Sequence, residues 1–144
     1  MESIEGFFRE YRFLSNFHVK EFTYKGKTYQ TSEHAYQAYK ATNEEDHEYV
    51  RSSPTPRDAR NRGQEIKMRP DWNEIKYDVM KEVLIEKFKD EELKELLLKT
   101  GNAYLEETNW WHDQFWGNCT CENCQHYTAK NSLGKILMEI RKNL

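Results

Sequence analysis

The spacing of hydrophobic residues predicts helices in the second half of the chain. From Trp72 to Phe88, apolar side chains recur every three or four residues, which indicates one amphipathic helix. The next predicted helix begins after Asp90 and ends at Gly101. The last runs from Leu133 to Arg141 and carries its apolar side chains on one face.

The first half of the chain has shorter and more polar patterns. Residues 7–31 are predicted to form short strands, with Gly26 in the turn of a hairpin. A helix is expected from Ser32 to about Thr42, and residues 43–55 are predicted to be a loop. A short helix should follow from Pro56 and end at Gly63. The prediction is an α+β class: one compact, mainly helical domain spanning residues 1–144, with a small antiparallel sheet near the N-terminus.

Composition narrows the class of protein. With 144 residues the chain can bury a core, but it is only 37% hydrophobic, so its 14% of aromatic residues must supply much of the buried area. A net charge of −3 does not favour general binding to nucleic acid or to an anionic membrane. We expect no secretory leader and no membrane span. Three cysteines within residues 119–124 do not form a secreted disulfide framework, so a reducing, cytoplasmic compartment is expected.

Glu33 is the first candidate for chemistry. It falls in the first turn of a predicted helix, where backbone N–H groups favour a carboxylate. Tyr36 and Gln37 follow three and four residues later, on the same face. Such a group can position a water against a polar substrate. The alternative is a surface carboxylate that only supports the helix start.

A second candidate is the acid Asp113, inside a run with three tryptophans in seven residues, Trp110, Trp111 and Trp116. These rings either fill the core or form a platform for a flat ligand. A tightly wound turn would place Asp113 beside the face of Trp116.

Basic residues gather between positions 51 and 69. Six bases against two acids give a local charge of +4, and the bases are Arg51, Arg57, Arg60, Arg62, Lys67 and Arg69. Arginine forks bind phosphate, so a small phosphorylated ligand fits this stretch better than duplex DNA does. A solvated helix face is the alternative.

The cysteines could hold a metal. Cys119, Cys121 and Cys124 with His126 offer the donors of a tetrahedral zinc site. However, these donors fall within eight residues, whereas knuckles pair ligands from two turns. The preferred interpretation is therefore reduced cysteines packed in a loop, with no metal.

Taken together, the motifs resemble the NADAR family of YbiA-like N-glycosidases. Their order and spacing hold from about residue 7 to residue 142. The matching segments are Phe8-Arg9, Leu14-Ser15-Asn16-Phe17, Ser32 to Ala38, Arg69-Pro70-Asp71-Trp72 with Lys76 and Met80, Asp113 to Gly117, and Asn131 to Met138 with Arg141.

The resemblance implies hydrolysis of an N-glycosidic bond between a ribosyl carbon and a nitrogen base, without a cofactor. The family acts on ribosylated pyrimidine intermediates of riboflavin synthesis or on ADP-ribose attached to guanine. By matching position, the catalytic set would be Glu33, Asp113 and Trp116. Substrate binding is assigned to Phe8, Arg9, Asn16, Phe17, Arg60, Arg69, Trp72, Lys76 and Asn131. Family members commonly carry Lys at the position of Arg60 and a base at that of Gln64.

The chemistry divides roles between two acids. Cleavage passes through an oxocarbenium-like state that a carboxylate stabilises. Glu33, in a first turn, should stay ionised, whereas Asp113 among Trp rings should be the proton donor. We expect removal of ADP-ribose from guanine, ahead of hydrolysis of the riboflavin-pathway substrate. No membrane partner is expected. The sequence leaves open whether the protein contacts ADP-ribosylated nucleic acid and which oligomeric state it adopts. The rival classes are a binding module for ADP-ribose or NAD and a zinc-stabilised interaction domain.

Overall fold

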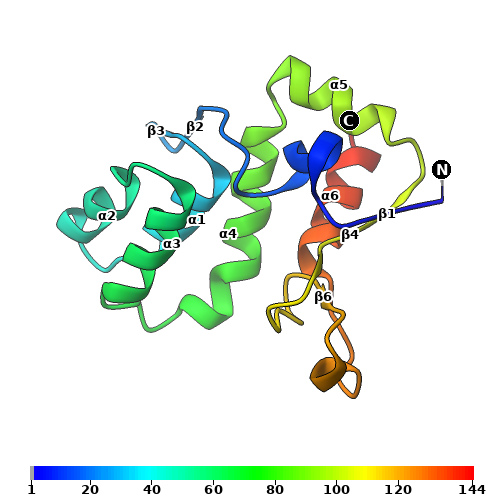
Figure 1. Ribbon diagram of the computed structural model, residues 1–144. Coiled ribbons are helices and arrows are strands. Elements are labelled where there is room, and N and C mark those ends of the chain that lie inside the picture. Colours follow the sequence, from blue (N-terminus) through cyan, green and yellow to red (C-terminus); the bar gives the residue numbers. More distant parts are fainter. Residues whose placement is uncertain (1) are drawn as a thin grey trace. The chain divides into compact units, whose positions relative to one another are not determined.

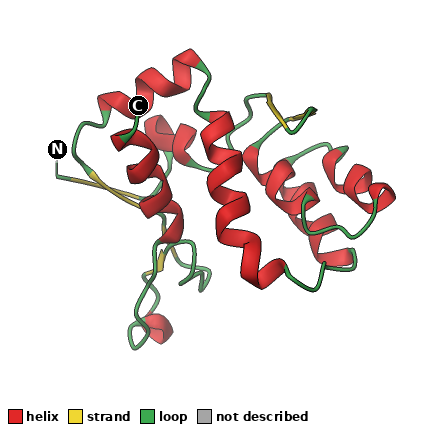
Figure 2. Cartoon of the chain, turned by 180° about the vertical axis from the view of Figure 1, so that it is seen from behind, coloured by secondary structure: helices red, strands yellow, loops and turns green. Residues whose placement is uncertain are grey.

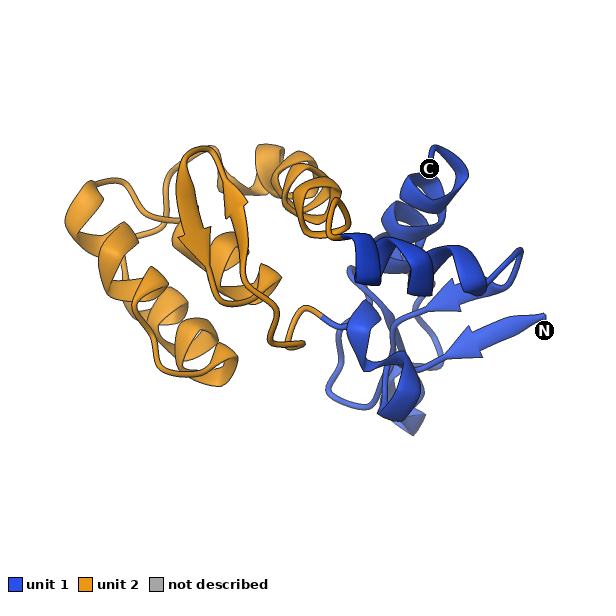
Figure 3. Cartoon of the chain, turned by 90° about the horizontal axis from the view of Figure 1, so that it is seen from above, with its two compact units in different colours: residues 1–15, 91–144 blue, residues 16–90 orange. Residues whose placement is uncertain are grey.

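The computed structural model describes residues 2–144 and confirms the α+β class, with helices as the main element (Figures 1 and 2). The chain divides into two compact units (Figure 3). We call residues 16–90 the central unit. The terminal unit combines the residues before Asn16 with residues 91–144. Across the described chain, no helix is both long and apolar enough to cross a membrane.

The predicted hairpin opens the central unit. Strands β2 (Phe22–Tyr24) and β3 (Lys27–Tyr29) pair antiparallel. Between them, Lys25 and Gly26 have φ angles of +50° and +84°, as a two-residue hairpin turn requires.

Helix α1 (Ser32–Ala38) follows, and every residue in it is buried. The side chain of Thr31 caps it by accepting a hydrogen bond from the backbone N–H of His34. The His34 ring lies 2.7 Å from the Thr31 hydroxyl and 2.9 Å from the Ser53 carbonyl, and burial lowers the pKa of His34. The helix ends at Ala38, before Thr42, the predicted end: the N–H groups of Lys40 and Ala41 donate to carbonyls three residues back, which is the tighter 3-10 pattern.

Helix α2 (Glu44–Arg51) lies where a loop was predicted, so that prediction was wrong. Asn43 caps it by accepting from the Asp46 backbone N–H at 2.8 Å. Arg51 forms an ion pair with Glu48 at 2.8 Å. Local polar contacts therefore support a helix in which Val50 is the buried residue.

Helix α3 (Pro56–Glu65) begins as predicted, with Thr55 as cap and Pro56 in the first turn. It continues past Gly63, the predicted end. A Cβ atom at Gly63 would lie 2.2 Å from Gln37 Oε1, so this glycine permits the close packing of α3 on α1 rather than ending the helix.

Helix α4 (Trp72–Lys87) confirms the longest predicted helix. It contacts both α1 and β2 within the central unit. Its buried residues include Lys87, where burial lowers the pKa to about 7.

The terminal unit contains a pairing that links distant parts of the sequence. Strand β1 (Ser3–Glu5) runs parallel to β4 (Tyr104–Glu106), with Ile4 opposite Leu105. The predicted strands over residues 7–17 are wrong, because Arg9–Leu14 form a 3-10 helix, η1. Phe13 and Leu14 are buried there without strand periodicity.

The remaining elements of the terminal unit surround β4. Helix α5 (Glu91–Lys99) precedes Gly101 as predicted, and α6 (Ser132–Lys142) contacts β4. Strands β5 (Thr108–Asn109) and β6 (Asn118–Cys119) pair parallel. A second 3-10 helix, η2 (Glu122–Cys124), lies in the loop before α6. In Figures 1 and 2 this loop projects away from the helices of its own unit.

Candidate functional site

Glu33 lies in the first turn of α1 and is only 8% exposed. A plain surface carboxylate is therefore the wrong alternative. The Gln37 amide donates from Nε2 to Glu33 Oε2 at 2.6 Å, one turn along the helix. A short hydrogen bond of this kind fixes the orientation of the carboxyl group.

Gln37 is itself fixed from its other side. Its Oε1 atom is buried, has no hydrogen-bond partner among the described residues, and lies against Gly63 of α3. Because Nε2 faces Glu33 and Oε1 faces a residue without a side chain, the amide is held by packing on one side and by the carboxylate on the other. The sequence placed Gln37 on the face of Glu33, but only the packing of α1 on α3 reveals this arrangement.

Asn16 contacts both the start of α1 and helix α4. Its backbone carbonyl accepts from the Glu33 N–H at 3.1 Å, and its Oδ1 accepts from the Ser32 hydroxyl at 2.7 Å. Its Nδ2 lies 3.6 Å from the sulfur of Met80 in α4. Asn16 was predicted to bind substrate; here it braces the turn that carries Glu33. Phe17, also predicted to bind substrate, follows it in sequence and is half-buried.

Three cations accompany Glu33 in the central unit. Burial lowers the pKa of Lys40, the negative charge of Glu33 opposes that shift, and the positive charges of Arg60 and Lys76 add to it. Lys40 is thus close enough to Glu33, Arg60 and Lys76 to be affected by the charge of each. Arg60 and Lys76 were predicted from the sequence. Lys40 was missed, although it lies four residues after Tyr36, just beyond the end of α1.

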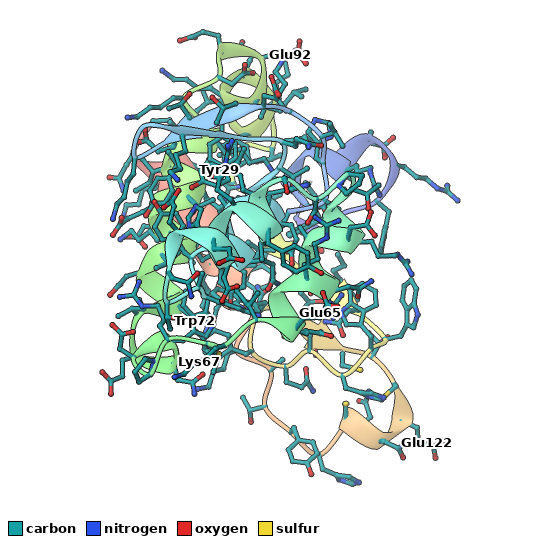
Figure 4. All side chains as sticks on the ribbon, turned by 90° about the vertical axis from the view of Figure 1, so that its left-hand side faces the viewer. Tyr29, Glu65, Lys67, Trp72, Glu92 and Glu122 are labelled. Carbon is teal, nitrogen blue, oxygen red and sulfur yellow. The ribbon has the colours of Figure 1, made fainter. Side chains whose placement is uncertain are left out.

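Aromatic rings lie beside these charges. The ring centroids of Tyr36 and Trp72 are 5.0 Å apart, and Lys40 Nζ is 5.8 Å from the centroid of the Tyr36 ring. Trp72, labelled in Figure 4, is 3% exposed and packs at the start of α4; its contact with substrate stays a prediction. The central unit therefore offers one oriented carboxylate with a phenol and several cations.

Three of the six basic residues between positions 51 and 69 contact partners within the fold. Arg51 binds Glu48, and Arg62 donates to the Tyr49 carbonyl and stacks on the Tyr49 ring at 4.6 Å. Arg69, predicted to bind substrate, donates to both oxygens of Asp71 at 2.7 and 3.0 Å. That hydrogen bond raises the pKa of Arg69. It lowers the pKa of Asp71. Much of the predicted cluster thus stabilises the fold.

Asp113 and Trp116 occupy a tight turn in the terminal unit. Asp113 Oδ1 accepts from the backbone N–H of Phe115 at 3.2 Å and of Trp116 at 2.8 Å. The Asn109 amide holds the backbone of Asp113 through two further hydrogen bonds. The Trp116 ring packs edge-on against Phe115, with centroids 4.7 Å apart. One carboxylate oxygen is therefore engaged in shaping the turn that presents Trp116.

Three other rings of this unit are exposed. Phe8, Trp110 and Trp111 are 43%, 64% and 39% exposed. The Phe8 and Trp110 centroids are 5.9 Å apart, and those of Trp110 and Trp111 are 5.0 Å apart. Of the two predicted roles for the tryptophans, a platform fits these rings better than core packing does. Arg9, beside Phe8, is exposed and has a φ angle of +55°.

Asn131 has a structural role. It is buried, with φ of +47°, just before α6. Its Oδ1 accepts from Glu107 N–H at 3.0 Å, and its Nδ2 donates to the Leu105 carbonyl at 2.9 Å and the Tyr104 hydroxyl at 3.1 Å. These contacts join the start of α6 to β4, and the substrate contact of Asn131 stays a prediction.

A comparison with family models identifies the protein family of this chain. The NADAR domain model matches residues 6–144 of the chain. The chain belongs to the NADAR family. That match confirms the resemblance read from the sequence motifs.

Named members of the NADAR family resemble this chain over most of its length. It is 36% identical over 138 residues to the N-glycosidase YbiA of Escherichia coli K12, covering 94% of this chain and 82% of the relative. An N-glycosidase of Nostoc punctiforme is 32% identical over 140 residues, covering 93% and 86%. A riboflavin biosynthesis protein of Vibrio vulnificus is 33% identical over 135 residues, covering 92% of this chain but 35% of the relative.

A solved structure of the family has the same fold. The NMR structure of Escherichia coli YbiA superimposes with a TM-score of 0.83 at 35% identity, covering 99% of this chain and 86% of that one. The likeness confirms the α+β class for this NADAR chain.

The cysteines of this NADAR chain gather around a histidine other than the predicted one. His112, Cys119, Cys121 and Cys124 bring their donor atoms within 4.8 Å of one another. His126, the histidine that the sequence suggested, is exposed and lies outside that group in the described chain. Burial raises the pKa of Cys124, and hydrogen bonds with the other two thiols raise it further. Burial alone would also raise the pKa of Cys119, but hydrogen bonds from Cys121 and Cys124 lower it to about 6.

Proposed function

We propose that this NADAR protein hydrolyses the N-glycosidic bond between a ribosyl carbon and a nucleobase nitrogen. The observation that carries the proposal is the buried, oriented carboxylate of Glu33, accompanied by the charges of Lys40, Arg60 and Lys76. A carboxylate suits an oxocarbenium-like transition state, and the cations suit a phosphorylated substrate. The names of the relatives from Escherichia coli and Nostoc punctiforme, both N-glycosidases, support the same reaction.

Glu33 would act on the sugar side of the bond. An ionised carboxylate can stabilise positive charge on the anomeric carbon and orient a water for attack. Gln37 would hold that carboxylate in one rotamer through its 2.6 Å hydrogen bond. Loss of one such electrostatic partner typically lowers kcat by about 10²–10³.

Asp113 and Trp116 are proposed, from the family resemblance, to act in the same reaction. Asp113 would give a proton to the leaving base, and the Trp116 ring would hold the base or the sugar cation. The loss of the alkaline limb of the pH–rate profile in Asp113→Asn would support this role for Asp113. An unchanged alkaline limb would assign the proton to another group.

We propose ADP-ribose attached to guanine as the substrate. Two phosphates would match the cations near Glu33, and the exposed rings of Trp110 and Trp111 offer faces on which a purine could stack. A second candidate is a ribosylated pyrimidine intermediate of riboflavin synthesis, which the name of the Vibrio vulnificus relative favours.

One experiment separates these alternatives. The wild type, Glu33→Gln and the control Glu45→Gln, an exposed acid on α2, are incubated with ADP-ribosylated guanosine, with ADP-ribosylated single-stranded DNA or RNA, and with a ribosylated aminopyrimidine. Release of free ADP-ribose by the wild type and the control, but not by Glu33→Gln, is the expected result. Tight binding without product in the wild type would instead identify a binding module. Full turnover by Glu33→Gln would refute the role of Glu33.

A further inference from the structure

The loop between β5 and α6 brings one imidazole to three thiols. His112 Nδ1 lies 3.3 Å from Cys121 Sγ, 3.3 Å from Cys124 Sγ and 3.9 Å from Cys119 Sγ. All four donor atoms lie within 4.8 Å of one another. The ligands come from separate pieces of chain: His112 lies between β5 and β6, Cys119 belongs to β6, and Cys121 and Cys124 are the N-cap and the last residue of η2.

These distances match a tetrahedral zinc site. Zinc bonds of about 2.3 Å to sulfur and about 2.0 Å to nitrogen, at tetrahedral angles, place nitrogen about 3.6 Å from each sulfur. The observed separations of 3.3 to 3.9 Å bracket that value. Cys121 and Cys124 also have the two-residue spacing common in structural zinc sites, and here it is wound by a 3-10 turn. Figure 4 labels Glu122 on this turn.

The surroundings of the four groups also fit a bound ion. Between residues 110 and 130, the only buried residues are Gly117, Cys119 and Cys124, so this segment has almost no apolar core. The side chain of Gln114 bridges two of the cysteines, accepting from Cys119 N–H at 2.7 Å and donating to the Cys124 carbonyl at 3.1 Å.

The backbone at His112 is the second unusual feature of the cluster. Its φ angle is +72°, a backbone conformation that residues other than glycine rarely adopt. The residue in this conformation is the one whose imidazole lies beside the three thiols. Such a conformation persists only where the surrounding contacts enforce it, and in this poorly buried segment a metal–imidazole bond would supply that contact.

We propose that His112, Cys119, Cys121 and Cys124 bind one zinc ion that stabilises this loop. Four protein ligands leave no open position for a water or a substrate, so the metal is structural rather than catalytic. On binding, the three thiols release their protons, and the neutral imidazole coordinates through Nδ1, giving Zn(Cys)₃(His) with a net charge of −1. His112 directly precedes Asp113, so the ion would also fix the turn that ends at Trp116. The site does not depend on the proposed glycosidase reaction.

The test is metal analysis of untagged protein purified under reducing conditions without chelator. We expect about one zinc per chain. Replacing zinc by Co²⁺ should give the strong visible bands and the sulfur-to-cobalt charge-transfer band of a tetrahedral thiolate site. Folded, reduced protein without zinc that also gives no such bands with Co²⁺ would overturn the proposal. Stoichiometric iron or copper in place of zinc would overturn the choice of metal.

The variants compare the two histidines. Cys121→Ser and His112→Asn should each lower the affinity for zinc at least about 10-fold, since even outer-shell changes cost that much. His126→Asn, two residues beyond Cys124, should keep zinc. If His126→Asn loses the metal and His112→Asn keeps it, the proposed ligand set is wrong. Cys121 is only half-buried, so its replacement should spare the fold; far-UV circular dichroism checks that point.

A measurement on the wild-type protein covers the case in which a variant fails to fold. Treatment with a strong chelator should change the tryptophan fluorescence, since Trp110, Trp111 and Trp116 lie in the same loop, and added Zn²⁺ should restore it. No change in fluorescence on complete removal of zinc would refute a role in ordering the loop. Glycosidase activity is measured in parallel: an inactive protein that holds zinc would refute the proposed function alone.

Discussion

Replacing Gly63 by alanine should lower activity while leaving the fold intact. A Cβ atom at this position in α3 would lie 2.2 Å from Gln37 Oε1, 3.0 Å from its Cδ and 3.1 Å from its Cβ. The Gln37 amide would have to swing away, and its 2.6 Å hydrogen bond to Glu33 would be lost. Glu33 would then keep its charge but lose the group that orients it.

The expected magnitudes differ for stability and for activity. Alanine gains about 1 kcal/mol of helix propensity over glycine, against about 1–3 kcal/mol for overpacking, so the net loss of stability should be about 0–2 kcal/mol. A hydrogen bond to a charged group is worth about 1.5–3 kcal/mol, which corresponds to a loss of roughly 10-fold to 150-fold in kcat.

The assay is a double-mutant cycle on release of the free base, with stability followed by urea denaturation. Gly63→Ala, Gln37→Ala and the double variant are compared, with the exposed Asn61→Ala of α3 as control. If Gly63 acts through Gln37, the double variant should be no slower than Gln37→Ala alone. Full activity in Gly63→Ala, or losses that multiply in the double variant, would refute this reasoning.

Three further predictions concern other parts of the central unit. Burial lowers the pKa of Lys87 to about 7, so between that pH and about 10 the unfolded chain binds one proton more than the folded chain. The free energy of unfolding should therefore rise over this range, at up to about 1.4 kcal/mol per pH unit. Denaturation curves of Lys87→Met should lose this slope, and an unchanged slope would contradict the assignment. Asn43→Ala should lower the stability by about 1 kcal/mol through the lost cap of α2, without changing kcat, and a thermal scan measures it. Arg60→Ala should raise KM for an ADP-ribosyl substrate, most strongly at low salt, whereas the exposed Arg57→Ala should not; equal effects would mean that neither arginine contacts the phosphates.

Local sequence patterns were enough to predict the elements that carry a clear signal in neighbouring residues. The helix from Trp72 has a sustained apolar period, and the hairpin has glycine in its turn, so both could be predicted. Helix α2 lacks an apolar period and depends on the cap Asn43 and on its ion pairs. Because the stretch is polar, it was predicted to be a loop. The parallel pairing of Ile4 with Leu105 joins residues about 100 positions apart, and no local pattern encodes it.

The candidate site shows the same division between local and long-range information. A carboxylate at a helix start could be found from Glu33 and its capped turn. The close packing of Gly63 against Gln37 could not be found from the sequence, because it arises where α3 packs on α1. Likewise, sequence proximity favoured His126 as the metal ligand, whereas the chain folds back and brings His112 to the thiols.

The parallel pairing of β1 with β4 has a consequence for synthesis on the ribosome. The central unit is one unbroken segment, so its contacts can form as soon as Asp90 has left the exit tunnel. Strand Ser3–Glu5 is made before the central unit, yet it has no partner strand until Tyr104–Glu106 has been made. The helix that carries Glu33 would therefore form early, whereas Ser3–Glu5 would stay an unpaired strand until Tyr104–Glu106 has left the tunnel.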